Sequence, residues 1–341
     1  MIPLSRAFFV SLLRYTACAS IALVNPAIAQ TPPSGCDMGE LATLPLKWTD
    51  DMRPISEAVI NGRPVPVMVS TAEAEAVVLN KKTLNKLGIA VRSSTSTMAP
   101  EDARNPTGNY LVREVSYAML DDFSFGTAKK KDVTYRVQDF MDDTFGVRIG
   151  AGTLLQTDIE IALDAGYIKL FKPKGCFRDH LAYWDPQAIS VLSTWDVLKR
   201  DPRILFNVQV GGKTVSALLS TATPHSYMPR AAAERLGLSA SSPGATREDP
   251  LPGHGPEQPV WKVPVSSISI GALEVKDFDL RLMDLPHSGE IMVLGADFLH
   301  RYRVYVAMSQ NQVYLSPIRV PRAVRRGSVE VIGTPAQRNE Q

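Results

Sequence analysis

Two segments of this 341-residue chain show the same order of hydrophobic and polar positions. In residues 57–69, two strand-like apolar runs flank the turn Asn61-Gly62-Arg63. In residues 206–219, a run of alternating apolar and polar residues precedes the turn Gly211-Gly212-Lys213, and a mostly apolar run follows it. Asn-Gly and Gly-Gly supply the positive φ angles that tight hairpins need. The pattern therefore predicts one β-hairpin at each place.

Each predicted hairpin leads directly into the tripeptide Ser-Thr-Ala, at 70–72 and again at 220–222. In both copies the serine follows the second residue of the turn, a glycine, by eight residues. A short helix is predicted after each tripeptide. The first ends at Leu87-Gly88-Ile89, and the second begins at Pro229 and ends at Leu236-Gly237-Leu238. Proline at the start and glycine just past the end are typical helix boundaries.

A third landmark also occurs twice. Val293-Leu294-Gly295 precedes a short predicted helix, and Val147-Arg148-Ile149-Gly150 does the same in the first copy. Both copies then end in a predicted strand pair, over 159–171 and over 304–315. Landmarks repeated in the same order indicate a duplicated structural unit. The alternative is an unrelated all-β sandwich or barrel, which also has short strands at close spacing.

This duplicated pattern resembles the retropepsin-like aspartic proteases, in which the tripeptide position reads Asp-Thr-Gly or Asp-Ser-Gly. The resemblance covers roughly residues 41–317 and implies a mostly β fold. Two retropepsin-like β-barrel lobes, 36–176 and 203–317, would form an intrachain pseudo-dimer, and we expect a monomer. The linker 177–202, with Trp184 and Trp195, is expected to pack against the lobes.

The resemblance also implies that catalysis is lost, because serine stands at both former catalytic positions, Ser70 and Ser220. In the family, two aspartates share a proton and serve as general base and general acid. A serine hydroxyl does not ionise near neutral pH, so it replaces neither group. We therefore expect no catalytic residue at these positions.

The other residues of the two tripeptides have their own implications. In the family the threonine helps to tie the loops together, and Thr71 and Thr221 are retained here. Ala72 and Ala222 replace the family's glycine, which permits close backbone approach. The interlobe contact is thus expected to persist without the carboxylates.

Other catalytic groups are alternatives to an inactive site. A serine nucleophile would need an oriented base, and no histidine lies near Ser70 in sequence. Glu73 and Glu75 follow the first loop, but the second loop has no matching acid. Asp297 matches a structural position of the family, and we interpret His225 as structural. We expect no metal and no cofactor.

Two polar stretches, 93–108 and 239–259, match the region where the family places a flap over its substrate; ordinary surface loops are the alternative. The favoured function is a pseudoprotease that binds an extended peptide or a protein partner by β-augmentation. One alternative is an active aspartic-type endopeptidase with unconventional catalytic residues. The other is a structural or assembly protein without a peptide groove.

The N-terminal 29 residues have the features of a signal peptide. Arg6 and Arg14 lie in the segment before the apolar core 16–24, and Ala27-Ile28-Ala29 fits a cleavage site. A membrane anchor is the alternative, but the core is far shorter than the roughly 20 residues that span a bilayer. We therefore expect a periplasmic or secreted protein without membrane insertion.

Charge and cysteine content restrict the partners and the compartment. Removal of 1–29 takes away two arginines and no acids, so the formal charge of +2 falls to zero. A neutral chain gives no electrostatic reason to expect nucleic acid. The arginine-rich stretch 318–341 is expected to be a flexible tail. Cys36 and Cys176 bracket the first copy, and either a disulfide or two separate thiols would fit.

Overall fold

The computed structural model describes residues 35–98, 111–140, 142–196, 201–249, 259–285 and 290–318. All of them belong to one compact unit. The predicted signal peptide and all but Ile318 of the predicted tail lie outside the described residues. The fold is mostly β, as predicted. No helix in the described part has the length and apolar character needed to cross a bilayer.

Six strands of the N-terminal half close into a ring because β7 pairs with β3. Around the ring, the strands are β3 (Pro54–Ile60), β4 (Arg63–Ser70), β9 (Val147–Gly150), β5 (Val77–Asn80), β8 (Ala128–Gln138) and β7 (Leu111–Phe125). Two outer strands extend it, β2 (Lys47–Trp48) on β3 and β6 (Arg92–Met98) on β7. Alternate residues of β3 and β4 are buried, as expected of strands with one face in a core.

A second ring in the C-terminal half has the corresponding strand order and is closed by pairing of β13 with β17. Its strands are β13 (Asp201–Val210), β14 (Lys213–Leu219), β19 (Met292–Leu294), β15 (Tyr227–Pro229), β18 (Leu273–Met283) and β17 (Val260–Ile270). The short β16 (Thr246–Glu248) pairs with β17 as β6 pairs with β7.

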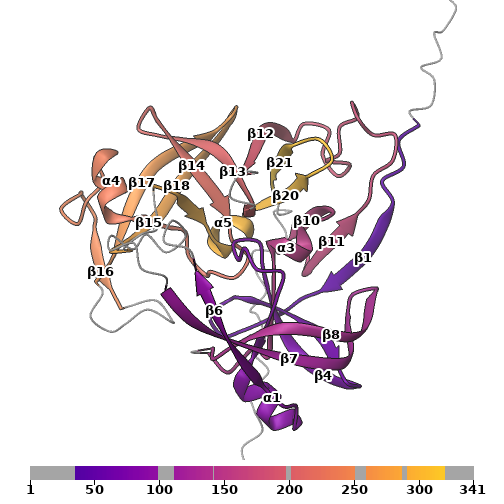
Figure 1. The fold of residues 1–341 in the computed structure, drawn as a ribbon. Coiled ribbons are helices and arrows are strands. Elements are labelled where there is room, and N and C mark those ends of the chain that lie inside the picture. Colours follow the sequence, from indigo (N-terminus) through magenta and orange to yellow (C-terminus); the bar gives the residue numbers. More distant parts are fainter. Residues whose placement is uncertain are drawn as a thin grey trace, which may run out of the picture. The chain divides into compact units, whose positions relative to one another are not determined.

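Six further strands form an antiparallel sheet that joins the two halves of the chain (Figure 1). In spatial order they are β1 (Glu40–Pro45), β11 (Tyr167–Phe171), β10 (Asp158–Ala162), β20 (Tyr302–Ala307), β21 (Gln312–Pro317) and β12 (Ile189–Asp196). At its centre, Ile159 of β10 lies opposite Val306 of β20. The segment expected as a linker therefore contains β12, which pairs with both β21 and β13.

The turns follow the sequence predictions. Positive φ angles occur at Asn61 (47°), Gly62 (77°), Gly211 (54°) and Gly212 (76°). The helices are α1 (Lys81–Leu87), α3 (Ala151–Leu154), α4 (Arg230–Arg235) and α5 (Ala296–Leu299). Helix α1 ends at Gly88 with a φ of 71°, which is the left-handed conformation predicted there.

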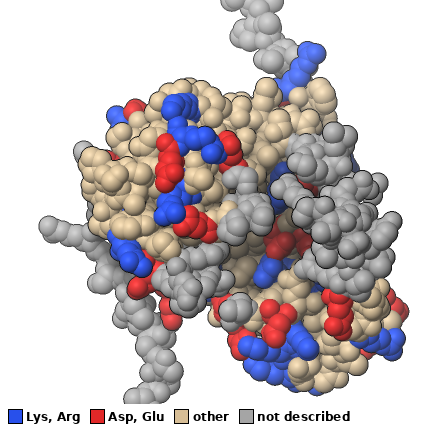
Figure 2. All heavy atoms as spheres, turned by 60° about the vertical axis from the view of Figure 1, so that its left-hand side comes forward, with Lys and Arg blue, Asp and Glu red and all other residues tan. Residues whose placement is uncertain are grey.

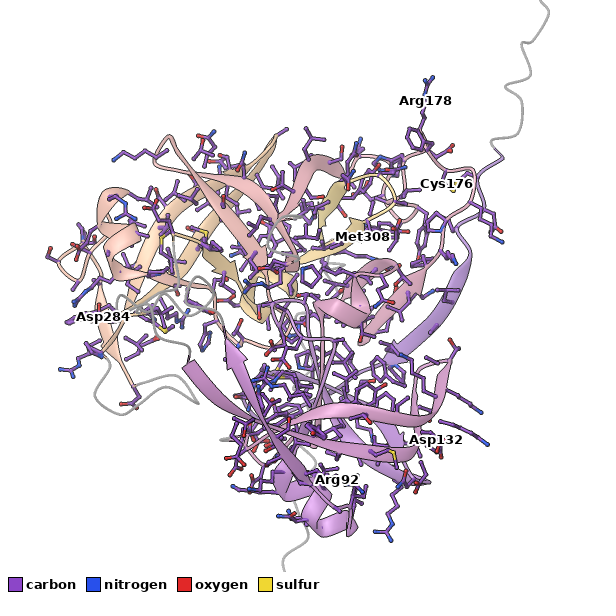
Figure 3. All side chains as sticks on the ribbon, in the orientation of Figure 1. Arg92, Asp132, Cys176, Arg178, Asp284 and Met308 are labelled. Carbon is purple, nitrogen blue, oxygen red and sulfur yellow. A yellow bond between two sulfur atoms is a disulfide. The ribbon has the colours of Figure 1, made fainter. Side chains whose placement is uncertain are left out.

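Cys36 and Cys176 form a disulfide, which confirms the first of the two predicted options and not the option of two separate thiols. Beside it, Asp37 and Lys174 exchange backbone hydrogen bonds, which hold the chain before β1 against the chain after β11. Figure 3 shows Cys176 in this loop, with Arg178 projecting away from the ribbon. A crosslink over 140 residues is expected to stabilise the fold by about 2–5 kcal/mol.

A buried ion pair links β10 to β20. Glu160 is fully buried and accepts hydrogen bonds from Arg303 (Nε, 2.6 Å), Tyr167 (3.1 Å) and Tyr183 (2.6 Å). The Arg303 guanidinium also lies over the Trp184 ring at 4.6 Å. On the face shown in Figure 2, acidic and basic residues are interspersed over the coloured surface.

Candidate functional site

The two Ser-Thr-Ala loops meet each other, although 150 residues separate them in sequence. The Thr71 hydroxyl donates a hydrogen bond to the Leu219 carbonyl at 2.7 Å. The Thr221 hydroxyl donates to the Val69 carbonyl at 2.5 Å and accepts from the Thr71 backbone N–H at 3.3 Å. Both threonines are buried, with 4% and 0% of their surface exposed. These three bonds hold the end of β4 against the end of β14.

The serines lie immediately before this contact. Ser70 is opposite Gly150 in the β4–β9 register, and the Ser220 N–H donates to the Leu294 carbonyl at 2.9 Å. Ser220 is 1% exposed, and its hydroxyl has no hydrogen-bond partner. Such an unpaired buried group is unusual in native proteins.

A glycine packs beneath each loop and leaves no room for a side chain. A Cβ atom on Gly150 would lie 2.0 Å from the Glu75 carbonyl oxygen, and one on Gly295 would lie 2.6 Å from the His225 carbonyl carbon. The next residue hydrogen-bonds the loop in both places, since the amides of Ala151 and Ala296 donate to the loop carbonyls at 2.7 and 2.8 Å. The local backbone arrangement is therefore the same around both tripeptides.

The acids that follow the first loop are paired with arginines. Glu73 lies 2.8 Å from Arg148, and Glu75 contacts Arg136. Glu73 and Glu75 therefore each form an ion pair within the first ring.

The second loop has no acid at the matching positions, but Asp297 of α5 accepts hydrogen bonds from the Ser226 backbone (2.9 Å) and hydroxyl (2.6 Å) beside it. Its carboxylate also lies 3.7 Å from Arg281 and 3.9 Å from the His225 imidazole. Burial lowers the pKa of His225 below its usual range, and the positive charge of Arg281 lowers it further. Asp297 thus anchors the loop to the start of α5.

Each stretch expected to form a flap contains one strand that the structure describes. In the first, β6 pairs with β7, and residues 99–108 lie outside the described part. In the second, β16 pairs with β17, and residues 250–258 lie outside it. Glu248 of β16 is bound by Arg281 at 3.0 Å, which fixes this strand near the second loop. A cavity of about 590 Å³ lies there, lined by His225, Arg247, Glu248 and Asp249.

A segment of the second ring is similar to a known protein family. Residues 206–298 match the family model of aspartyl proteases. The matched segment begins in β13, includes Ser220 and Thr221, and ends in α5. No curated protein matches the chain. This aspartyl protease-like segment contains one complete Ser-Thr-Ala loop together with the glycine that packs beneath it.

The sequence reasoning missed a pair of residues that occurs before each hairpin. Arg53 binds Asp51 through Nε at 2.7 Å, and Arg203 binds Asp201 through Nε at 2.8 Å. Each arginine precedes its serine by 17 residues. The pattern Asp-x-Arg, which occurs at 51–53 and again at 201–203, is the sequence signal that could have revealed these two ion pairs.

Proposed function

We propose that the mature chain is an exported, aspartic-protease-like protein that binds an extended peptide or a protein partner without cutting it. The observation that carries this proposal is the contact between the two loops. Their threonines still bind each other's strands, while a hydroxyl stands where the family has each carboxylate. The scaffold for a paired site is thus retained without its acid–base groups.

The chemistry supports an inactive site. Peptide hydrolysis by this family needs one carboxylate to take a proton from water and a second to donate one to the peptide. Each such group is worth roughly 10²–10⁴-fold in rate. The nearest acids after the first loop are occupied by Arg148 and Arg136, so they do not substitute for the missing pair.

The fold supports a role in peptide binding. An extended peptide can add to strand edges, with pockets for alternate side chains. The outer strands β6 and β16 provide such edges in the two halves, and the cavity at His225 lies beside one of them. In this proposal the two rings are retropepsin-like lobes within 36–176 and 203–317, packed as an intrachain pseudo-dimer, and the protein is monomeric.

Export is supported by the signal-like N-terminus and by the disulfide, because disulfides persist mainly outside the cytoplasm. We accordingly infer a periplasmic or secreted protein. A mass measurement of the exported chain tests the expected cleavage before Gln30.

A restoration experiment tests the function. Ser70→Asp and Ser220→Asp are combined with Ala72→Gly and Ala222→Gly, and the matched control carries Asn in place of both Asp residues. Unfolded, fluorescently labelled casein serves as both ligand and substrate, at acidic and neutral pH. We expect the unaltered chain to bind casein without cleavage, and only the Asp variant to cleave it.

The other outcomes identify the alternatives. Cleavage by the unaltered chain at a rate comparable with that of the Asp variant would show an unconventional peptidase. Absence of both binding and cleavage in all forms would support a structural or assembly role without a peptide groove.

A further inference from the structure

The second ring contains an open cavity of about 610 Å³ beside the β13–β14 turn, at the end of β14 opposite to Ser220. Its walls come from that turn, from β17 and from the chain at the end of α4. They include a glycine, three apolar residues and two serines: Gly211, Leu236, Leu238, Pro264, Ser266 and Ser267. A volume of this size lies within the range of small-molecule sites.

The first ring has an equivalent place, which the strand register identifies. Ile60 pairs with Phe123 just before the first turn, and Val210 pairs with Ile268 just before the second turn. Residues of β7 therefore correspond to residues of β17 with numbers higher by 145, the difference between 268 and 123. The equivalent pairs are Met119 and Pro264, Asp121 and Ser266, and Asp122 and Ser267.

A side-chain amide closes this place in the first ring. The oxygen of the Asn61 side chain accepts a hydrogen bond from the Asp122 backbone N–H at 3.0 Å. Its nitrogen donates to the Asp121 carboxylate at 3.1 Å. The Asn61 backbone N–H also donates to the Asp122 carbonyl at 2.9 Å. The carboxamide group thus bridges the turn and β7.

The second ring has a smaller residue at each position of this rim. Gly211 takes the place of Asn61, with a φ of 54° where Asn61 has 47°. A Cβ on Gly211 would meet only the Leu236 carbonyl oxygen, at 4.0 Å, so this side of the turn is open. Serine and proline stand in place of Asp121 and Met119. The cavity therefore includes the space that a carboxamide fills in the first ring.

Hydrogen-bonding groups still face this space. Ser267 has the same register against β18 as Asp122 has against β8. Its N–H is therefore directed toward Gly211, which has no side-chain acceptor for it. The exposed Ser266 hydroxyl stands at the position of the Asp121 carboxylate, and it can accept a hydrogen bond. The cavity thus has one donor and one acceptor placed for a carboxamide.

We propose that this cavity binds a small molecule that carries a primary carboxamide on an apolar group. The carboxamide oxygen would accept from the Ser267 N–H, and its nitrogen would donate to the Ser266 hydroxyl. The apolar group would lie against Leu236, Leu238 and Pro264. No charged side chain lines the cavity within the described ranges, which favours a neutral amide over a carboxylate. This site does not depend on the proposed peptide binding.

The test uses the mature full-length chain, labelled with ¹⁵N, and benzamide as the probe. We expect saturable shifts of the Ser267 and Gly211 amide signals at millimolar benzamide. Benzoate has the same ring but no N–H donor, and it is charged. It should bind at least about two- to tenfold more weakly, the range for the loss of one hydrogen bond.

Two variants test the assigned groups. Gly211→Asn copies the first ring, and asparagine tolerates the positive φ of this turn, so its own carboxamide should abolish benzamide binding. The control Gly166→Asn changes another turn glycine with positive φ and no atom within 4 Å of its Cβ, and it should leave binding unchanged. Ser266→Ala should weaken binding about two- to tenfold, and it serves as the second variant if Gly211→Asn does not fold.

Amide hydrogen exchange tests the difference between the rings without a ligand. The Asp122 amide should exchange more slowly than the Ser267 amide, because only Asp122 has a side-chain acceptor in the turn. Gly211→Asn should slow exchange at Ser267. The proposal would be overturned by the absence of saturable shifts at Ser267, by equal affinity for benzoate, or by unchanged binding in folded Gly211→Asn.

Discussion

Removal of the Thr221 hydroxyl is the most direct test of the contact between the loops. Thr221→Val keeps the shape of the side chain but leaves two buried groups without partners, the Val69 carbonyl and the Thr71 N–H. Each unsatisfied group costs about 1–3 kcal/mol, so we expect a loss of about 2–6 kcal/mol in the free energy of unfolding. Thr71→Val leaves only the Leu219 carbonyl unpaired and should cost about 1–3 kcal/mol.

Urea unfolding followed by tryptophan fluorescence measures both values. Thr221→Ser is the matched control because it retains the hydroxyl. The double variant should lose less than the sum of the single variants, since both act on one hydrogen-bond network. A Thr221→Val cost equal to or below that of Thr71→Val would refute the assignment of two bonds to the Thr221 hydroxyl.

Three further outcomes follow from individual contacts. Gly150→Ala should destabilise the fold by several kcal/mol because its Cβ would overlap the Glu75 carbonyl oxygen; urea unfolding gives the value. Glu160→Gln should cost about 3–5 kcal/mol in the same assay, because it leaves the charge of Arg303 without its buried partner. The pKa of His225 is lowered from 6.5 by burial and then by the charge of Arg281. The unfolded chain therefore binds a proton more readily, and native stability falls as the pH drops below about 6.5. His225→Gln should reduce this slope, and an unchanged slope between pH 5 and about 6.5 would contradict it.

The local features of the fold were predictable because they depend on short-range chemistry. Asn61-Gly62 and Gly211-Gly212 need positive φ, and the structure has it at all four residues. The disulfide was one of two options, which the sequence positions of the cysteines did not decide. The contact between the threonines was expected only through the resemblance to a family.

Features that depend on distant parts of the chain had no sequence signal. Glu160 and Arg303 are 143 residues apart, and neither is marked by a neighbouring motif. Ring closure by β3 and β7 likewise requires knowledge of the strand order.

The pairing of β10 with β20 has a consequence for the order of folding. One edge of β10 pairs with β11, and the disulfide joins Cys36 to Cys176, so both contacts can form from residues before 177 alone. Its other edge has no partner until Tyr302–Ala307 has been synthesised. An unpaired edge is a template for association with other chains, and contacts between such distant residues form slowly. The last strands of the chain therefore protect the first half from aggregation, and a truncation before Tyr302 would expose it.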